Sequence, residues 1–377
     1  MEYTRIFNEL RLLYSPREAE ISIPGSDIKI YNTEFNSDVP ADDFLNVNDT
    51  LIPENYLFSY PVFAPGNRSS EKVILLLHGL NERSWVKYLA WAYWLASNTD
   101  SYVVLFPISF HINRSPESWS DPRKMLNLMK LRKSTLGEIR MSSFANAALS
   151  NRLSEDPMRF FNSGYQTVSD IVKLLSTIKR GEHPIIPKSN RFNIFAYSIG
   201  AFLAEIIMMG NPEELFSESK LFIFCGGSVF SNMQGTSKLI MDDKAYQIVY
   251  DYYLNDFEKI IEGRNSLTDI LKFSPIGMAF RSMIDFSILK TFRENILRKL
   301  KKQIHTITLK KDIVIPEKGV IATLSKWNTD LRKMVEVWDF PYVYSHENPF
   351  PVFDSPLSKQ VDQSFERVFK EACSFLA

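Results

Sequence analysis

One serine of this sequence stands where a nucleophile could be activated. Ser198 lies in the pentapeptide Ala196-Tyr-Ser-Ile-Gly200, between a short apolar run at 192–195 and a stretch with helical spacing that ends at Gly210. A serine in a tight strand-to-helix turn is the layout of a nucleophile elbow. Such a turn strains the backbone of the serine, so the residues two before and two after it must be small. The helix that follows offers N–H groups and a positive dipole end to a developing negative charge.

The pentapeptide has a second interpretation. An elbow usually has glycine at both flanking positions, so Ala196 departs from the pattern and crowds the turn. Serine is also a preferred residue at a helix N-cap, and Ser198 could have only that role. The residues before and after the pentapeptide must decide between the two.

Several reactive side chains, including Ser198, follow apolar runs that we predict to be strands. They are His78, His111, Ser198, Cys225, Asp312 and His346. Ligands of open parallel sheets bind outside the carboxyl ends of the strands. The predicted topology therefore brings these side chains to one rim.

The hydrophobic pattern predicts the elements that position this rim. Buried strands are expected at 73–77, 101–106, 192–195, 220–225, 303–309 and 334–340, and antiparallel edge strands at 21–23, 28–31 and 56–63. Besides the helix after Ser198, helices are expected at 6–14, 84–96, 123–140, 165–178, 245–254, 257–261, 267–273, 284–300 and 361–376. Strands followed by repeated β–α units predict an α/β fold with a mostly parallel sheet and helices on both faces.

The same pattern predicts the domain organisation. Residues 1–54 are expected to form an N-terminal extension with a short helix and edge strands, and 55–228 with 301–377 the core. The stretch 229–300 contains no good strand and reads as a helical cap inserted between late strands, a natural position for a lid.

Composition excludes several classes of protein. The 377 residues are 45% hydrophobic, and Lys+Arg and Asp+Glu balance at 44 each, so no global field recruits nucleic acid. Two cysteines give neither a disulfide framework nor a metal-ligand spacing, and we expect no metal and no organic cofactor. Without a signal peptide or an apolar run long enough to span a membrane, a cytoplasmic location is expected.

From about residue 55 to its end, the sequence resembles the α/β-hydrolases. The resemblance rests on His78-Gly79, on the Ser198 pentapeptide, on Asp312 after the penultimate strand and on His346 after the last. The spacing between Asp312 and His346 leaves room for one helix and one strand, as the layout of this family needs.

The resemblance implies a catalytic triad in the chain order Ser, Asp, His. Ser198 Oγ would attack a carbonyl carbon, His346 would take the proton and return it to the leaving group, and Asp312 would orient the imidazole. The backbone N–H groups of Ile199 and of Leu80, next to the His-Gly turn, would form an oxyanion hole.

Each residue also has an ordinary structural interpretation. Asp312 could be a turn residue paired with its flanking lysines, although the stretch after the strand at 220–225 offers no carboxylate before Asp242. His346 could be a surface histidine, and Cys225 fits a buried strand residue better than a nucleophile because no basic partner is predicted beside it.

His78, His111 and Arg114 are candidates for lining a substrate pocket. A structural contact in the long loop that carries His111 and Arg114 is an equal alternative.

The predicted function is that of a serine hydrolase that cleaves a carboxylic ester or related small acyl substrate through an acyl-enzyme. One alternative is a non-catalytic binding protein on the same fold. The other is a membrane-surface lipase that uses the basic helices at 123–140 and 290–302. The oligomeric state and the natural acyl and leaving groups stay open.

Overall fold

The computed structural model describes residues 2–38, 47–67, 69–263, 265–327, 334–352 and 357–377. Across these residues one sheet of nine strands has the order β1-β2-β3-β5-β4-β6-β7-β8-β9. The strands are β1 (Glu20–Ser22), β2 (Lys29–Asn36), β3 (Leu57–Ala64), β4 (Lys72–Leu77), β5 (Tyr102–Leu105), β6 (Arg191–Tyr197), β7 (Leu221–Phe224), β8 (Ile304–Leu309) and β9 (Val335–Trp338). Pairing is antiparallel from β1 to β3 and between β3 and β5, and parallel from β5 through β4 to β9. Each predicted strand is present, although β2 runs on to Asn36.

Alternate side chains of the parallel strands enter two different cores. In β4, Val73, Leu75 and Leu77 belong to one buried cluster, whereas Ile74 and Leu76 belong to the other. Strands buried on both faces therefore have the continuous apolar runs seen in the sequence.

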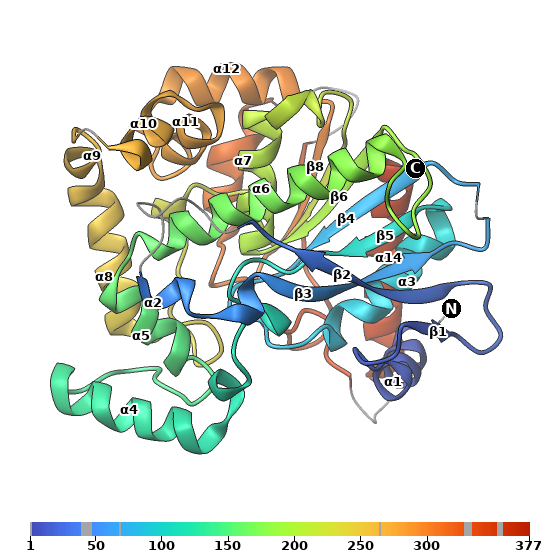
Figure 1. The fold of residues 1–377 in the computed structure, drawn as a ribbon, viewed down its shortest axis with the longest axis horizontal. Coiled ribbons are helices and arrows are strands. Elements are labelled where there is room, and N and C mark those ends of the chain that lie inside the picture. The colour runs from blue at the N-terminus through green and yellow to red at the C-terminus, as the bar shows by residue number, and fades with distance from the viewer. Residues whose placement is uncertain (1, 39–46, 68, 264, 328–333, 353–356) are drawn as a thin grey trace.

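Helices cover both faces of the sheet (Figure 1). One face packs against α1 (Tyr3–Leu13), α3 (Val86–Thr99) and α14 (Ser358–Leu376), and the other against α6 (Arg159–Arg180) and α7 (Ile199–Gly210). The remaining helices are α2 (Val47–Thr50), α4 (Pro122–Leu136), α5 (Ala147–Glu155), α8 (Asp243–Asp251), α9 (Phe257–Ile260), α10 (Ser266–Phe273), α11 (Pro275–Ser282), α12 (Lys290–Leu300) and α13 (Glu317–Leu324). The mostly parallel sheet between helical layers, with a strand–turn–helix at Ser198, is the α/β-hydrolase fold, and the predicted fold class is confirmed.

Helices α8 to α12 follow β7 and precede β8, and they lie together beside one end of the sheet (Figure 1). The described part of 229–300 contains no strand. Its role as a cap or lid stays a prediction. The predicted extension 1–54 contributes β1 and β2 to the same sheet, and its residues 39–46 lie outside the described part of the chain.

Several predicted helix boundaries are wrong, and the local backbone conformation explains two of them. The helix expected at 284–300 begins only at Lys290, because the preceding Leu289 is left-handed with φ 45°. The helix expected at 123–140 ends at Leu136, before Gly137 with φ 78°. The helix expected at 165–178 begins earlier, at Arg159. Helices α2, α5, α11 and α13 were not expected.

No helix in the described ranges combines the length and apolarity needed to cross a membrane.

One buried carboxylate stands out in this core. Glu205 on α7 is 0% exposed, and neither of its carboxylate oxygens has a hydrogen-bond partner among the described residues. Burial raises the pKa of Glu205 well above its ordinary value. The folded state therefore keeps a proton that the unfolded chain releases, so stability falls as pH rises from the ordinary range of glutamate toward the raised pKa.

We predict that Glu205→Met stabilises the protein by about 1–3 kcal/mol at pH 8 and by less at pH 5, because it removes an unpaired buried polar group. Chemical denaturation at the two pH values measures this effect. The exposed Glu18→Met is the matched control. An equal change at both pH values, or a destabilisation at pH 8, would contradict this interpretation of Glu205.

Candidate active site

Ser198 occupies a strained turn between β6 and α7. Its backbone has φ 58° and ψ −125°, a left-handed region that a side chain rarely adopts. The small neighbours predicted from the sequence are in place. Ala196 is fully buried between Leu77 of β4 and Ile223 of β7, so the elbow accommodates alanine where glycine is usual.

Gly200 allows α7 to approach the end of β4. A Cβ atom on Gly200 would lie 2.6 Å from the carbonyl oxygens of both Leu77 and His78. Both are main-chain atoms, which cannot move away easily. This close approach fixes the start of α7 against the His-Gly turn.

Three predicted residues meet at this elbow. The hydroxyl oxygen of Ser198 lies 2.6 Å from Nε2 of His346, and Nδ1 of His346 lies 2.7 Å from Oδ2 of Asp312. All three side chains are buried. A hydroxyl, an imidazole and a carboxylate in one hydrogen-bonded row is the arrangement that activates a nucleophile and orients its base.

The loop after β8 fixes the carboxylate. Oδ1 of Asp312 accepts hydrogen bonds from the backbone N–H groups of Val314 and Ile315, each at 2.9 Å. Its other oxygen is left for His346. Asp312 is therefore both the turn residue that one interpretation expected and a partner of the histidine.

The residue before the serine holds the histidine. The ring of Tyr197 stacks on that of His346, with centroids 5.5 Å apart and planes 17° apart, and its hydroxyl donates to the carbonyl oxygen of His346. Because Tyr197 ends β6, the elbow and the histidine loop are joined directly. His346 is 3% exposed and is not a surface histidine.

Leu80 and Ile199 lie beside Ser198 at the wall of a cavity that all three residues line. No hydrogen bond to the N–H of Leu80 or Ile199 is formed by any described residue. Both residues line the same two cavities described below. The resemblance to the α/β-hydrolases assigns these two N–H groups to an oxyanion hole, and that role stays a prediction.

His78 has a structural role. Its Nδ1 donates to the carbonyl of Gly79 at 2.8 Å, and its Nε2 accepts from the N–H of Ile108 at 2.9 Å. Burial lowers the pKa of His78 to about 4, so the ring stays neutral. Both ring nitrogens are engaged in joining the loops after β4 and β5, so His78 has none left for a substrate.

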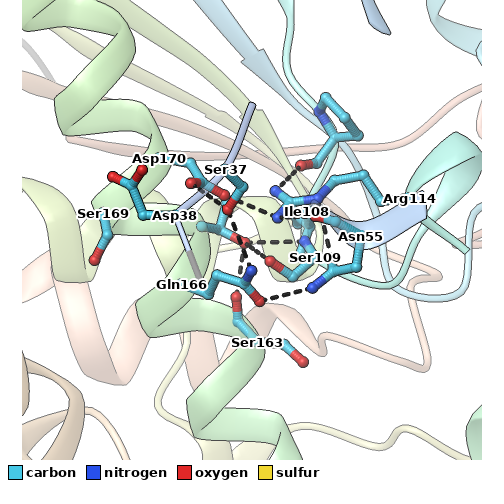
Figure 2. A network of polar contacts seen from close by, with 12 residues as sticks. Ser37, Asp38, Asn55, Ile108, Ser109, Arg114, Ser163, Gln166, Ser169 and Asp170 are labelled. Atoms are coloured by element: carbon cyan, nitrogen blue, oxygen red, sulfur yellow. Dashed lines mark hydrogen bonds and ion pairs between the residues drawn. The ribbon is translucent and has the colours of Figure 1, made fainter. Parts of the chain in front are cut away.

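Arg114 is also structural. Its guanidinium is fully buried, pairs with Asp170 at 2.8 Å, and donates to Asn55 and to the carbonyl of Pro107. Figure 2 shows this network, which ties the loop after β5 to α6. Arg114 does not line the cavities beside Ser198, and the structural alternative describes it better than the pocket role.

His111 differs from these two residues because it lines a cavity. Its Nδ1 donates to the carbonyl of Ser109 at 2.9 Å, and its Nε2 has no hydrogen-bond partner in the described chain. Burial, then the neighbouring His78, lowers the pKa of His111 to about 3. Nε2 is therefore an unprotonated acceptor.

Cys225 at the end of β7 is a buried free thiol. Burial, followed by the charge of Asp312, raises its pKa well above the ordinary value. The thiol therefore stays protonated, as expected for a buried strand residue.

Two largely apolar cavities lie at the elbow, and Ser198 lines one of them. The first, here the serine cavity, is lined by Ser198, Leu80, Ile199, Phe160, Phe230, Met233, Ile240, Val314, Ile315 and others. The second, here the apolar cavity, shares Leu80, Phe160 and Ile199 with it and extends along His111, Val168, Phe202, Leu203, Ile276 and Phe280. In the part of the chain that is described, no group of three or more His, Cys, Asp or Glu side chains could hold a metal ion.

One family model matches most of this sequence. The model of a family of unknown function, DUF6051, matches residues 37–377. The chain belongs to DUF6051. No curated protein matches it.

Several solved structures resemble this DUF6051 protein at low sequence identity. A bacterial heroin esterase is 12% identical with a TM-score of 0.47, over 100% of this chain and 90% of that one. A carboxyl esterase from the fungus Tuber melanosporum is 9% identical with a TM-score of 0.43, over 94% and 88%. An esterase from Pyrococcus furiosus is 14% identical with a TM-score of 0.40, over 92% and 90%.

Sequence reasoning missed several residues around the site of this DUF6051 member. Tyr197 lies inside the elbow pentapeptide, but nothing in the sequence indicates that it stacks on His346. Ile276 lines the apolar cavity from α11, a helix that was not predicted. The available signal was Ser274-Pro275, since Ser274 caps the helix and proline favours its first turn.

We predict that Gly200→Ala destabilises the protein by about 1–3 kcal/mol or more, since the added methyl group overlaps main-chain oxygens of β4. Thermal denaturation measures the change. Gly164→Ala in α6 is the control, because its Cβ would meet only Leu203 at an ordinary 3.8 Å. Equal midpoints for the two variants would show that α7 does not need glycine at this position.

Proposed function

We propose that this protein is a serine hydrolase that cleaves a carboxylic ester or related acyl compound through an acyl-enzyme. The observation that carries the proposal is the row of contacts from Ser198 Oγ to His346 Nε2, at 2.6 Å, and from His346 Nδ1 to Asp312, at 2.7 Å. A plain helix N-cap would need none of these contacts, and the Ser198 side chain makes no capping hydrogen bond.

The reaction would follow from the roles of these atoms. As Ser198 Oγ attacks the carbonyl carbon, its proton passes to Nε2 of His346, and the resulting imidazolium is stabilised by the carboxylate of Asp312. The same proton is then given to the leaving alcohol. Water attacks the acyl-enzyme by the same route and releases the acid.

The oxyanion would be stabilised by backbone N–H groups. Ile199 at the start of α7 and Leu80 after the His-Gly turn both line the two cavities that meet beside Ser198, and their N–H groups would be the donors. Donors in such a position typically contribute about a hundredfold or more to the rate.

The cavities favour an acyl substrate with apolar parts. The serine cavity and the apolar cavity meet at Leu80, Phe160 and Ile199, so groups on the two sides of a scissile bond could each enter one. A non-catalytic binding protein would also use such cavities. A binding protein would not need a buried hydroxyl, imidazole and carboxylate in one hydrogen-bonded row. We therefore prefer the hydrolase.

A membrane-surface lipase is a second candidate. Helix α4 lies at the periphery of the molecule (Figure 1) and exposes Leu126, Leu131 and Leu136 among its basic residues. Arg132 of this helix is not part of that surface, because it pairs with the buried Asp242 at 2.8 Å. Salt-sensitive binding to anionic liposomes would favour this candidate.

A cytoplasmic location stays a prediction.

Hydrolysis of p-nitrophenyl esters of increasing chain length tests the proposal. We predict that Ser198→Ala lowers kcat by about a thousandfold or more and that Asp312→Asn lowers it strongly, because a triad acts as a unit. Cys225→Ser is the control for the other nucleophile at this rim. Full activity of folded Ser198→Ala would refute the mechanism.

A further inference from the structure

A third cavity continues from the apolar cavity, away from Ser198. It shares His111, Leu149, Leu153, Arg159 and Ser163 with the apolar cavity. Its other lining includes Arg83, Trp119 and Arg152, so we call it the arginine cavity. The three cavities form one series from the serine hydroxyl to a cluster of cations.

Arg83 has no carboxylate partner in the described chain. Its guanidinium donates to Oδ1 of Asn81 at 2.9 Å, and its Nε forms no hydrogen bond with a described residue. Burial, followed by the charge of Arg152, lowers the pKa of Arg83 to about 10. Arg83 is therefore a partly buried cation whose surroundings disfavour its charge.

The neighbouring charges do not balance this cation. Arg152 and Arg159 both pair with the carboxylate of Asp49, at 2.9 and 3.0 Å. One buried carboxylate is thus shared by two arginines, and the other carboxylate partner of Arg159 is the half-exposed Glu155. The arginine cavity carries more positive than negative charge.

An aromatic ring brings two of the cations together. The guanidinium carbon of Arg152 lies 4.7 Å from the ring centre of Trp119, and that of Arg83 lies 6.0 Å from the same ring. His111 lines the same space with its unpartnered Nε2. Two guanidinium groups at one ring, beside an unsatisfied buried acceptor, form a polar end to an otherwise apolar series of cavities.

We propose that the arginine cavity binds an anionic group, a carboxylate or a phosphate, carried by the ester that Ser198 cleaves. This inference rests on the proposed function for the ester and extends it to the class of substrate. Arg83 supplies a guanidinium without a carboxylate partner and Arg152 the second charge, while Nε2 of His111 accepts a hydrogen bond from a hydroxyl or amide group of the same substrate. The main chain links the two ends, because Arg83 follows the oxyanion residue Leu80 by three positions.

Matched esters test the proposal. One pair is p-nitrophenyl hydrogen adipate and its neutral methyl ester, with the charge on the acyl side. The other is p-butanoyloxyphenyl phosphate and the neutral p-methoxyphenyl butanoate, with a phosphate on the leaving group. The value of kcat/KM is measured for each ester. Comparison of the two pairs distinguishes a site for a carboxylate from a site for a phosphate.

We predict that the wild-type protein prefers the anionic member of at least one pair and that Arg83→Gln lowers this preference by about tenfold or more, as expected for a lost charged hydrogen bond. Arg83→Lys keeps the charge and should retain part of the preference. Arg17→Gln, at an exposed arginine between α1 and β1, is the matched control. A wild-type preference for both neutral esters, or a preference unchanged in Arg83→Gln, would overturn the proposal.

A second measurement separates this inference from the hydrolase proposal. If no ester is cleaved, calorimetric titration with adipate and with inorganic phosphate tests the cavity directly. Binding to wild type that Arg83→Gln weakens tenfold or more would support the anion site, although the hydrolase proposal would have failed. Absence of binding, together with absence of hydrolysis, would overturn both. If Arg83→Gln does not fold, Arg83→Lys is compared with wild type in the same titration.

Discussion

The strained backbone of Ser198 is the constraint on which the rest of the site depends. A non-glycine residue at φ 58° and ψ −125° is expected to cost about 1–3 kcal/mol, and the surrounding structure must hold it there. Strand β6 lies between β4 and β7 in the middle of the sheet, and α7 packs against the end of β4 with only a glycine between them. The hydroxyl is therefore positioned by the most buried part of the fold.

Several polar side chains around this elbow are held by hydrogen bonds. His78 and Arg114 join the loops after β4 and β5 to each other and to α6, and Asp312 is fixed by two backbone N–H groups. Other buried polar atoms of the described chain have no partner, and two of these atoms lie near the cavities. Nε2 of His111 and Nε of Arg83 both belong to side chains that line the series of cavities from Ser198.

The sheet could be predicted because its strands are apolar runs long enough to identify. The meeting of Ser198, Asp312 and His346 could be predicted because each of these residues follows such a strand. Helix α11 was missed although Ser274 and Pro275 mark its start. The arginine cavity could not be predicted. Arg83, Trp119 and Arg152 come from three separate segments, and no spacing in the sequence indicates that they meet. His78 and Arg114 were plausible pocket residues by position, but their side chains are used in tertiary hydrogen bonds.

The most direct test of the central claim is covalent labelling of Ser198 with a fluorophosphonate, read by intact mass and peptide mapping. The phosphorus centre reacts with a serine only where the hydroxyl is activated by its base. The account predicts one adduct, located on Ser198, that is absent in Ser198→Ala and strongly reduced in His346→Ala. A folded wild-type protein that forms no adduct, or forms it on another residue, would contradict the assignment of Ser198 as a nucleophile.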